Sequence, residues 1–460
     1  FTVNKGLYCE VKIPGQSINP RLIQDIEQEM RGMIANNVPI LKHGIPRQEA
    51  IELFQTRGNR GKAALIASLP HPMISIYTCC NYPDYLYGAM LPETKLLGQF
   101  ALDVEQSGVL IRTPDEMTDG KIRTRVEQPK FGHILSEAKE WARILECPYI
   151  SDLNQINTEH RMGELIRVSE ALQEKRIGQI ADHIASHRNN IRLILIAGPS
   201  SSGKTSFAQR LRIQLRVNGL HPIMISLDDY FLNREDTPRN EKGQYDYESI
   251  DAIDTALFNR NMLELLNGHR VQIPYYNFIT GKREWHDDNF LLMKEDQPII
   301  IEGIHGLNER LTADIARKNK YKIYISALTQ LNIDAHNRIP TTDVRFLRRL
   351  VRDHQFRGAK AIKTIKQWPD VRAGEEKYIF PFQEEADVLF NSALIYEIGV
   401  LKKYAVPLLE AIGRGEEGYT EARLILRFLQ YVDEIHDIDD IPNNSIFREF
   451  IGKSVFFKEK

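Results

Sequence analysis

Two adjacent carboxylates, Asp228 and Asp229, follow a short apolar stretch in the sequence ISLDDYF. Apolar stretches of this kind form buried strands, and in open α/β sheets ligands bind where such strands end. A carboxylate at a strand end can accept the proton of a substrate hydroxyl during phosphate transfer. The alternative is an ordinary turn or helix-capping aspartate, which needs no ligand. The surroundings of Asp228, the candidate general base, decide between these interpretations.

A phosphate-binding motif precedes this pair. The sequence GPSSSGKTS, residues 198–206, fits the pattern G-x-x-x-x-G-K-[ST] and follows the apolar stretch IRLILIA. The glycines let the loop fold around a phosphate, and the positive end of the following helix attracts the same anion. The pattern assigns Lys204 to the β- and γ-phosphates and Thr205 to Mg²⁺. A serine-rich turn that caps a helix is the alternative, which the strand before the motif and the helix after it disfavour. The residues predicted to bind ATP or GTP are Gly198, Pro199, Ser200, Ser201, Ser202, Gly203, Lys204, Thr205 and Ser206.

Further charged side chains occur at positions where a phosphate-transfer site needs them. Glu302 ends the apolar stretch PIIIE, a good position to hold Mg²⁺ or its waters. The sequence DVRFLRRLVRDHQFRG, residues 343–358, repeats arginines at helical spacing. Cations on a mobile segment can neutralise the charge of a transferring phosphate. A solvated basic helix explains most of these arginines, and we expect Arg352 and Arg357 to be the functional ones.

The apolar stretches that carry these residues define the fold class. IRLILIAG, PIMISL, PIIIEG and YKIYISA are nearly continuous apolar runs, and helical stretches separate most of them. Runs that are apolar on both faces and alternate with helices predict a parallel sheet covered by helices on both sides. We therefore expect an α/β P-loop kinase domain, preceded by an α+β module.

The chain has 460 residues, which is too long for a single ordinary core. We expect an α+β module at 1–150, a connecting helix at 151–190, the P-loop domain at 191–415 and a C-terminal helical extension at 416–460. The first module contains strand-like stretches, GLYCEVKI, ISIYTCC and GVLIRT, and a helical one, PRLIQDIEQEMRGMI. Because the chain begins at Phe1 and not at Met, we expect part of the natural N-terminus to precede it.

Composition narrows the class of protein. Hydrophobic residues make up 42% and charged residues 27% of the chain, and the net charge is −2. A chain with this near-neutral charge is not expected to carry a broad basic surface that binds nucleic acid or membranes. We therefore do not expect tRNA or RNA as a partner. The four cysteines form no C-x-x-C pair, which fits a reducing, cytoplasmic location. The sequence leaves open whether the chain forms a homo-oligomer.

Residues from about 190 to 410 resemble the uridine kinase family, which is related to phosphoribulokinase and pantothenate kinase. The matching stretches are GPSSSGKT, SLDDYF, GQYDYESIDAID, VQIPYYNF, IIIEGI and RRLVRDHQFRG. The resemblance implies that Asp228 activates the 5′-hydroxyl of a nucleoside. It also implies that Arg352 and Arg357 belong to a lid over the phosphates.

The same resemblance assigns the acceptor side. It places the ribose contacts on Glu248 and Asp251 and the base-packing tyrosine on Tyr276. This chain has Glu248 where the family has an aspartate, so the sugar contact is altered. Five residues after Tyr276, where uridine kinases have a histidine that binds the pyrimidine, this chain has Gly281. The resemblance therefore implies either a relaxed choice of nucleoside or a preference for bases other than uracil and cytosine.

Residues 1 to about 150 resemble the accessory region that precedes the catalytic core of threonyl-tRNA synthetase. The matching stretches are GIPRQEAIELF and LPHPMISIYTCCNYPDYLYGAMLPET. In the synthetase this region hydrolyses mischarged tRNA with His and Cys side chains. Here Leu86 and Met90 stand where Cys and His are needed, and neither can bind a metal or move a proton as those residues do. We therefore do not expect the editing reaction.

Two classes of function follow. The first is a kinase that uses ATP and Mg²⁺ to phosphorylate a nucleoside 5′-hydroxyl or, as a variant, another small alcohol. The second is a nucleotide-dependent RNA-binding or regulatory P-loop protein. Asp228, Glu248 and the stretch RDHQFRG favour the kinase, because a switch protein does not need to activate an alcohol.

Overall fold

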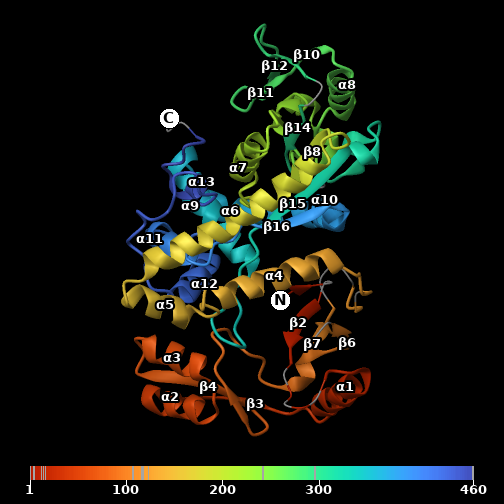
Figure 1. Ribbon diagram of the computed structural model, residues 1–460. Coiled ribbons are helices and arrows are strands. Elements are labelled where there is room, and N and C mark those ends of the chain that lie inside the picture. The colour runs from red at the N-terminus through yellow and green to blue at the C-terminus, as the bar shows by residue number, and fades with distance from the viewer. Residues whose placement is uncertain are drawn as a thin grey trace. The chain divides into compact units, whose positions relative to one another are not determined.

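The computed structural model describes residues 2–457 except residues 4, 5, 12, 14, 16, 106, 107, 115–118, 123, 241, 242, 295 and 296. The chain forms two compact units (Figure 1). The smaller unit comprises Phe1–Glu137, Cys147–Gln155 and Leu331–Ile339, and the larger unit comprises Ala138–Glu146, Ile156–Gln330 and Pro340–Lys460. The chain therefore contributes to the smaller unit three times, and neither unit is one continuous stretch of sequence.

The larger unit is built around a parallel sheet of five strands in the order β16-β15-β8-β14-β9. The strands are β8 (Leu193–Ala197), β9 (Ile223–Ser226), β14 (Ile299–Glu302), β15 (Lys320–Ser326) and β16 (Val388–Asn391). The four apolar stretches predicted to form strands are β8, β9, β14 and β15, so the predicted parallel sheet is confirmed. The edge strand β16 is not among the stretches predicted to form strands.

The register of this sheet brings three strand ends to one level. Glu302, the last residue of β14, pairs with Ile196 of β8 on one side and with Ser226 of β9 on the other. The phosphate-loop motif follows β8, Asp228 follows β9, and Glu302 is itself the end of β14. They consequently lie at the same edge of the sheet, where ligands bind in open α/β folds.

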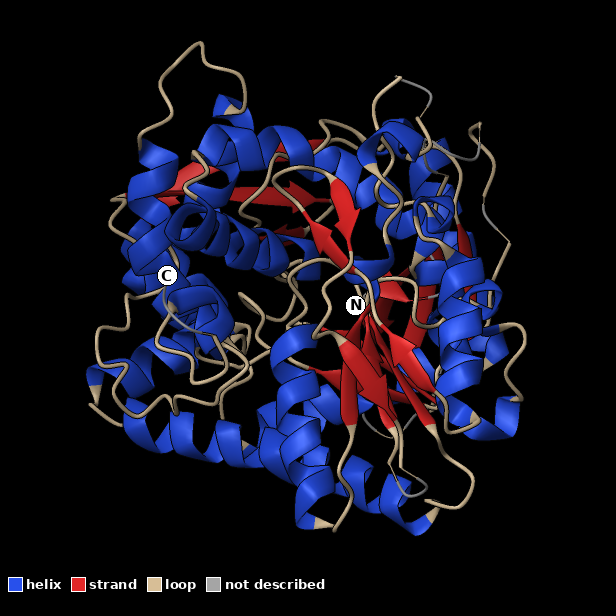
Figure 2. Cartoon of the chain, turned by 90° about the horizontal axis from the view of Figure 1, so that it is seen from above, coloured by secondary structure: helices blue, strands red, loops and turns tan. Residues whose placement is uncertain are grey.

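Helices cover both faces of the sheet, because successive strand residues point to opposite sides. Ile194, Ile196 and Ile300 pack with α6 (Met162–Ser186) and α7 (Lys204–Val217). Leu193, Leu195 and Ile301 pack on the other face with α8 (Thr255–Leu266). Figure 1 labels α6 and α7 beside the strands of this sheet, and Figure 2 shows strands with helices around them. The helix predicted to connect two domains is therefore part of the core of the larger unit.

The larger unit contains further elements besides this sheet and its covering helices. Among them are the short helical turns η2 (Leu227–Tyr230), η4 (Ile250–Ala252), η5 (Glu309–Thr312) and η7 (Phe380–Glu385), the helices α9 (Thr341–Arg357), α10 (Ala361–Tyr378), α11 (Glu397–Glu410), α12 (Tyr419–Leu429) and α13 (Arg448–Ile451), and two antiparallel pairs, β10 (Arg270–Gln272) with β13 (Phe290–Leu292) and β11 (Tyr275–Asn277) with β12 (Lys282–Glu284). The C-terminal stretch is less helical than its sequence predicts, because residues 430–447 between α12 and α13 contain no helix.

The smaller unit combines two antiparallel sheets with helices, which confirms the predicted α+β class. One sheet has the order β1-β2-β7-β6, with β1 (Thr2–Val3), β2 (Gly6–Glu10), β7 (Gly108–Arg112) and β6 (Ala101–Glu105). The helix α1 (Pro20–Ala35) packs on it through Ile23, which contacts Leu102 and Val109 in a shared core. The second sheet consists of β3 (Ile40–Pro46), β4 (Met73–Cys79) and β5 (Tyr82–Asp84). The helices α2 (Arg47–Thr56) and α3 (Arg60–Ser68) lie between β3 and β4 in the sequence. Across the described ranges of both units, no helix is long and apolar enough to cross a membrane.

Candidate active site

The phosphate-loop motif forms a tight loop between β8 and α7 that requires its two glycines. A side-chain carbon on Gly198 would lie 2.0 Å from the carbonyl oxygen of Ile325, so only glycine fits there. Gly203 has a φ of +83°, and a side-chain carbon there would lie 2.3 Å from Ile446. Ser201 also has a positive φ, of 60°. This backbone shape is the one that turns successive N–H groups toward an anion.

The start of α7 offers donors to such an anion. The first hydrogen bond of the helix runs from the N–H of Phe207 to the carbonyl of Gly203. The N–H groups of Gly203, Lys204 and Thr205 have no hydrogen-bond partner in the part of the chain that the structure describes. The ammonium of Lys204 donates to the carbonyls of Gly198 and Pro199, at 2.9 and 3.2 Å. The loop therefore fits a nucleotide phosphate, with Lys204 folded back along it.

Thr205 and Glu302 meet beside this loop. The hydroxyl of Thr205 donates to the carboxylate of Glu302 across 3.4 Å. Burial raises the pKa of Glu302 to about 7, and the charge of Asp228 acts in the same direction, whereas Lys204 lowers it. Among the described residues, no group of three or more His, Cys, Asp or Glu side chains is arranged to hold a metal ion. A hydroxyl with one carboxylate suits Mg²⁺, which keeps several waters and takes further oxygens from phosphates.

The two adjacent aspartates point to different partners. The carboxylate of Asp229 accepts a hydrogen bond from the N–H of Tyr276 at 3.3 Å, and burial raises its pKa to about 6. Asp228 instead interacts with the charges of Lys204 and Arg357. Crowding by protein atoms raises the pKa of Asp228, and the two cations oppose that effect. Asp229 therefore holds β11 in place, and Asp228 faces the phosphate loop.

Three arginines of α9 form hydrogen bonds with the phosphate loop. Arg345 donates to the carbonyl of Ser200 at 3.0 Å, and Arg348 donates to the carbonyl of Ser201 at 3.4 Å. Arg349 donates to the hydroxyl of Ser200 at 2.8 Å. Arg345 and Arg348 are fully buried, so their guanidinium groups position the loop and do not reach into solvent. The spacing of the arginines in the sequence indicated a shared helical face but not what that face contacts.

The arginines predicted to be functional, Arg352 and Arg357, lie further along α9. Both pair with Asp353, at 3.1 and 3.3 Å, and Arg349 pairs with the same carboxylate at 3.3 Å. The charge of Arg357 also interacts with that of Asp228. The charge of Arg357 therefore acts on the candidate base, whereas no described contact joins Arg352 to the loop.

Glu375 of α10 completes the support of the loop, and sequence analysis missed it. Its carboxylate accepts a hydrogen bond from the N–H of Ser200 at 3.0 Å, pairs with Arg345 and accepts from Arg372 at 3.0 Å. The side chain is fully buried. Glutamates in helices are common on solvated faces, so the sequence held no signal for this contact.

Glu248 and Tyr276, predicted to contact the acceptor, lie near the aspartates. Burial raises the pKa of Glu248 to about 7, while the charges of Arg349 and Lys204 lower it, which places this carboxylate on the phosphate side. Tyr276 is buried in an aromatic cluster, with its ring 5.5 Å from that of Phe231 and 5.0 Å from that of Phe278. The structure therefore brings Glu248 toward the phosphate loop and Tyr276 beside Asp229.

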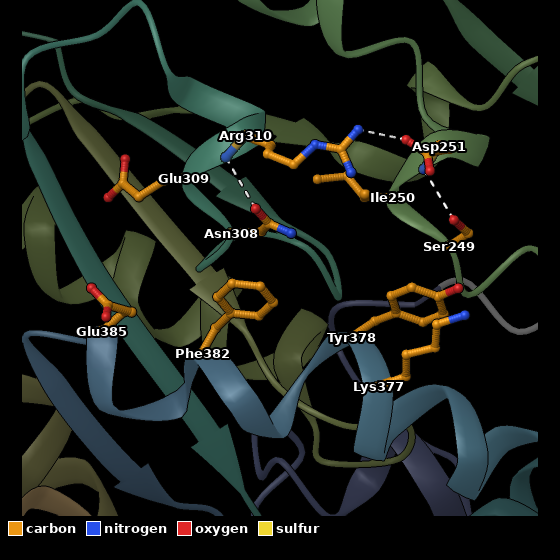
Figure 3. A pocket seen from close by; sticks show the side chains of 10 residues that line it. All are labelled: Ser249, Ile250, Asp251, Asn308, Glu309, Arg310, Lys377, Tyr378, Phe382 and Glu385. Atoms are coloured by element: carbon orange, nitrogen blue, oxygen red, sulfur yellow. Dashed lines mark hydrogen bonds and ion pairs between the residues drawn. The ribbon is translucent and has the colours of Figure 1, made fainter.

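Asp251, the other predicted acceptor contact, lies elsewhere. It lines a cavity of about 620 Å³, shown in Figure 3, and pairs there with Arg310 at 2.6 Å. The lining residues are Ser249, Ile250, Asp251, Asn308, Glu309, Arg310, Lys377, Tyr378, Phe382 and Glu385. None of Asp228, Glu248 or Tyr276 is among them. The short helical turn η4 thus directs Asp251 away from the other predicted acceptor residues.

A parallel sheet with a phosphate loop after β8, an acid at the end of the adjacent strand β14 and another acid after β9, the next strand in the sheet, matches a P-loop kinase fold. Residues 193–397 match the model of the Phosphoribulokinase / Uridine kinase family. This match supports the assignment of these residues to the P-loop kinases and covers less than half of the chain.

Individual relatives agree with this assignment. The chain is 32% identical over 203 residues to a uridine kinase of Saccharomyces cerevisiae, an alignment that covers 44% of this chain and 36% of the yeast protein. It is 29% identical over 201 residues to a uridine kinase of Staphylococcus haemolyticus, which covers 44% of this chain and 87% of that protein. The chain thus spans about a third of the yeast relative. A solved structure described as a possible uridine kinase from Bacillus stearothermophilus aligns with 47% of this chain at 20% identity, but the TM-score of 0.32 is too low to support an argument.

Proposed function

We propose that the larger unit transfers the γ-phosphoryl group of ATP to the 5′-hydroxyl of a nucleoside. The observation that carries this proposal is the position of Asp228. It follows β9 at the edge where the phosphate loop opens, and its charge interacts with those of Lys204 and Arg357. A P-loop protein that only switches between nucleotide states has no use for a carboxylate that can accept a proton there.

The proposed chemistry is a single in-line transfer. Asp228 accepts the proton of the acceptor hydroxyl as the hydroxyl oxygen forms a bond to the γ-phosphorus. The bond from that phosphorus to the β–γ bridging oxygen breaks, and ADP leaves with the electron pair. Burial raises the pKa of Asp228 above the ordinary aspartate value, which makes its carboxylate a stronger base for this proton transfer.

The nucleotide phosphates would bind along residues 198–206, with Lys204 turning from the loop carbonyls toward the β- and γ-phosphates. Thr205 and Glu302 would hold Mg²⁺, which neutralises part of the phosphate charge when it is bound. Arg357, together with Arg352, would stabilise the charge that develops on the transferred group. On the acceptor side we assign Glu248 to the sugar and Tyr276 to the base.

Phosphorylation of another small alcohol is the second candidate. Glu248 stands where uridine kinases have an aspartate, and Gly281 stands where they have the pyrimidine-binding histidine. Asp251, which the family resemblance assigns to the sugar, lines a separate cavity. All three differences fall on residues that the family resemblance assigns to the acceptor, so they leave the choice of acceptor open.

A phosphate-transfer screen tests the proposal. Purified protein is incubated with Mg²⁺ and either ATP or GTP, and with each common nucleoside or with pantothenate, and labelled product is measured. A nucleoside 5′-monophosphate as the product supports the proposed function. Transfer to pantothenate alone supports the second candidate. Hydrolysis or binding of the nucleotide with no acceptor product would contradict both.

A further inference from the structure

The C-terminal segment of the chain packs against the phosphate loop. Ile446 lies against Gly203, at the start of α7. Three residues later, the carboxylate of Glu449 in α13 accepts hydrogen bonds from Ser206, at 3.3 Å from the backbone nitrogen and 2.8 Å from the hydroxyl. A residue more than 240 positions from the loop therefore supplies an anion to the first turn of α7.

These donors are the ones that a nucleotide needs. Ser206 is the third residue of α7, so its N–H has no intrahelical partner and points out of the positive end of the helix. It directly follows the unpartnered N–H groups of Lys204 and Thr205. The charge of Glu449 also interacts with those of Lys204 and Glu302. A phosphate chain in the loop would bring further negative charge to a position that a carboxylate already occupies.

The segment is anchored so that Glu449 is held in place. Arg448 donates to the carbonyls of Ile438 and Ile441, at 3.1 and 2.7 Å. Phe447 packs edge-to-face on Tyr396 with 5.9 Å between ring centroids, and Phe450 lies under the guanidinium of Arg348 at 4.9 Å. This last contact joins the segment to the same α9 that supports the loop.

The described contacts of Glu449 are made with the first turn of α7. Ser206 supplies both of its described hydrogen bonds, and among the described residues no lysine, arginine or histidine forms an ion pair with its carboxylate, although the charge of Lys204 acts on it from a longer distance. Carboxylates that are half-buried only for stability normally pair with a cation. A carboxylate whose donors are those of a phosphate site instead imitates the anion that the site binds.

We infer that Glu449 is an autoinhibitory contact that competes with the nucleotide for the first turn of α7. Nucleotide binding then requires α13 to withdraw its carboxylate from Ser206, so the position of the C-terminal segment sets the nucleotide affinity. This inference rests on the proposed function, since it concerns the same phosphate loop. The competing explanation is that Glu449 caps α7 and only stabilises it.

The two explanations predict opposite effects of Glu449→Gln in the full-length protein. The amide keeps the size of the side chain and removes the charge. Competition predicts that the Kd for ATP and for ADP, measured by calorimetric titration with and without Mg²⁺, falls about tenfold. The effect should shrink at high salt because charge repulsion is screened. Glu421→Gln, an exposed acid in the first turn of α12, is the matched control and should leave both Kd values unchanged.

The outcomes separate this inference from the proposed function. An unchanged or raised Kd in Glu449→Gln, with a lower midpoint of urea unfolding, would show that Glu449 is a cap and would overturn the inference, while phosphate transfer by the wild type would keep the proposed function standing. Glu449→Ala gives a second test, because loss of a cap would destabilise α7 and weaken nucleotide binding, whereas loss of a competitor would tighten nucleotide binding. Failure of every variant and of the wild type to bind nucleotide would overturn both.

Discussion

The carboxylate of Glu375 accepts a hydrogen bond from the backbone N–H of Ser200, with 3.0 Å between nitrogen and oxygen. Arg345, which pairs with this carboxylate, donates to the carbonyl of the same Ser200 at 3.0 Å. One ion pair from α9 and α10 therefore holds both the donor and the acceptor of a single residue in the phosphate loop. The loop shape depends on a buried charge pair as well as on its glycines.

Glu375→Ala should destabilise the larger unit by about 3–5 kcal/mol, because Arg345 would remain as a buried charge without its partner. The measurement is the free energy of unfolding in urea, followed for the transition of the larger unit. Arg372→Ala is the matched control. Arg372 binds the same carboxylate from a partly exposed position, and its loss should cost about 1 kcal/mol or less. A loss of less than about 1 kcal/mol in the free energy of unfolding of Glu375→Ala would show that the ion pair of Glu375 with Arg345 does not stabilise the larger unit.

The ionisation of Glu302 should make the stability of the nucleotide-free protein depend on pH. Burial and the charge of Asp228 raise the pKa of Glu302 to about 7 in the folded protein, above its ordinary value of 4.5. Between these two values the folded protein binds more protons than the unfolded chain, so stability is full below about pH 4.5 and is lost as the pH rises through 7. Glu302→Gln removes the effect. We expect the wild type to lose on the order of 2 kcal/mol relative to this variant between pH 5 and pH 8.

Urea unfolding at pH 5, 6, 7 and 8, without nucleotide or Mg²⁺, measures this difference. Glu410→Gln, at the exposed end of α11, serves as the control and should follow the wild type at every pH. If Glu302→Gln also follows the wild type, Glu302 ionises like a surface carboxylate and its placement beside Thr205 and Lys204 needs another explanation.

The choice of nucleoside should differ from that of the uridine kinases. Gly281 closes the turn between β11 and β12 with a φ of +71°, and a side-chain carbon there would lie 2.6 Å from the guanidinium of Arg234. Nearby Arg283 is committed to Asp254, at 2.9 Å, and to the carbonyl of Phe231. Gly281 itself therefore supplies no side-chain contact to a pyrimidine, unlike a histidine at this position. A site without such a contact discriminates only modestly between bases.

The values of kcat/KM for uridine, cytidine, thymidine, adenosine, guanosine and inosine, measured side by side, test this prediction. We expect differences of about tenfold or less, or a preference for a base other than uracil and cytosine. Lys282→Ala and His286→Ala provide the comparison, since both residues are close to the turn in sequence. A sharp preference for uridine and cytidine that neither substitution changes would place the base contact on another element.

The sequence predicts the sheet and the phosphate loop because both depend on local patterns. Continuous apolar runs mark β8, β9, β14 and β15, and the glycines, Lys204 and Thr205 occur at fixed spacing. The convergence of Glu302 and Asp228 also follows, because parallel strands end at one edge of a sheet. These predictions need no knowledge of which distant segments touch.

The contacts that the sequence does not predict are the distant ones. Glu375 and Glu449 reach the loop from helices whose glutamates are indistinguishable in sequence from solvated ones. Arg345 and Arg348 share a helical face with Arg352, and only the packing of α9 shows which of them contact the loop. The direction of Asp251 depends on the short helical turn η4, which the apolar pattern around it does not reveal.

Lys204 and Asp228 should serve different steps of the proposed reaction. Lys204→Ala removes the charge that faces the β- and γ-phosphates, so it should weaken nucleotide binding by about tenfold or more and lower transfer with it. Calorimetric titration with ATP measures the first effect, and the rate of product formation at saturating acceptor measures the second. Normal ATP affinity in Lys204→Ala would mean that the nucleotide does not bind along residues 198–206.

The turnover of Asp228→Asn tests the central claim most directly. This variant keeps the size of the side chain and removes the base, so ATP affinity should stay within a few-fold of the wild type while kcat for the best nucleoside falls about 10²-fold or more. Asp229→Asn is the matched control on the neighbouring residue, because an amide oxygen can still accept the hydrogen bond from Tyr276, and its kcat should change little. A near-normal kcat in Asp228→Asn would show that Asp228 is only a turn residue and would contradict its assignment as the general base.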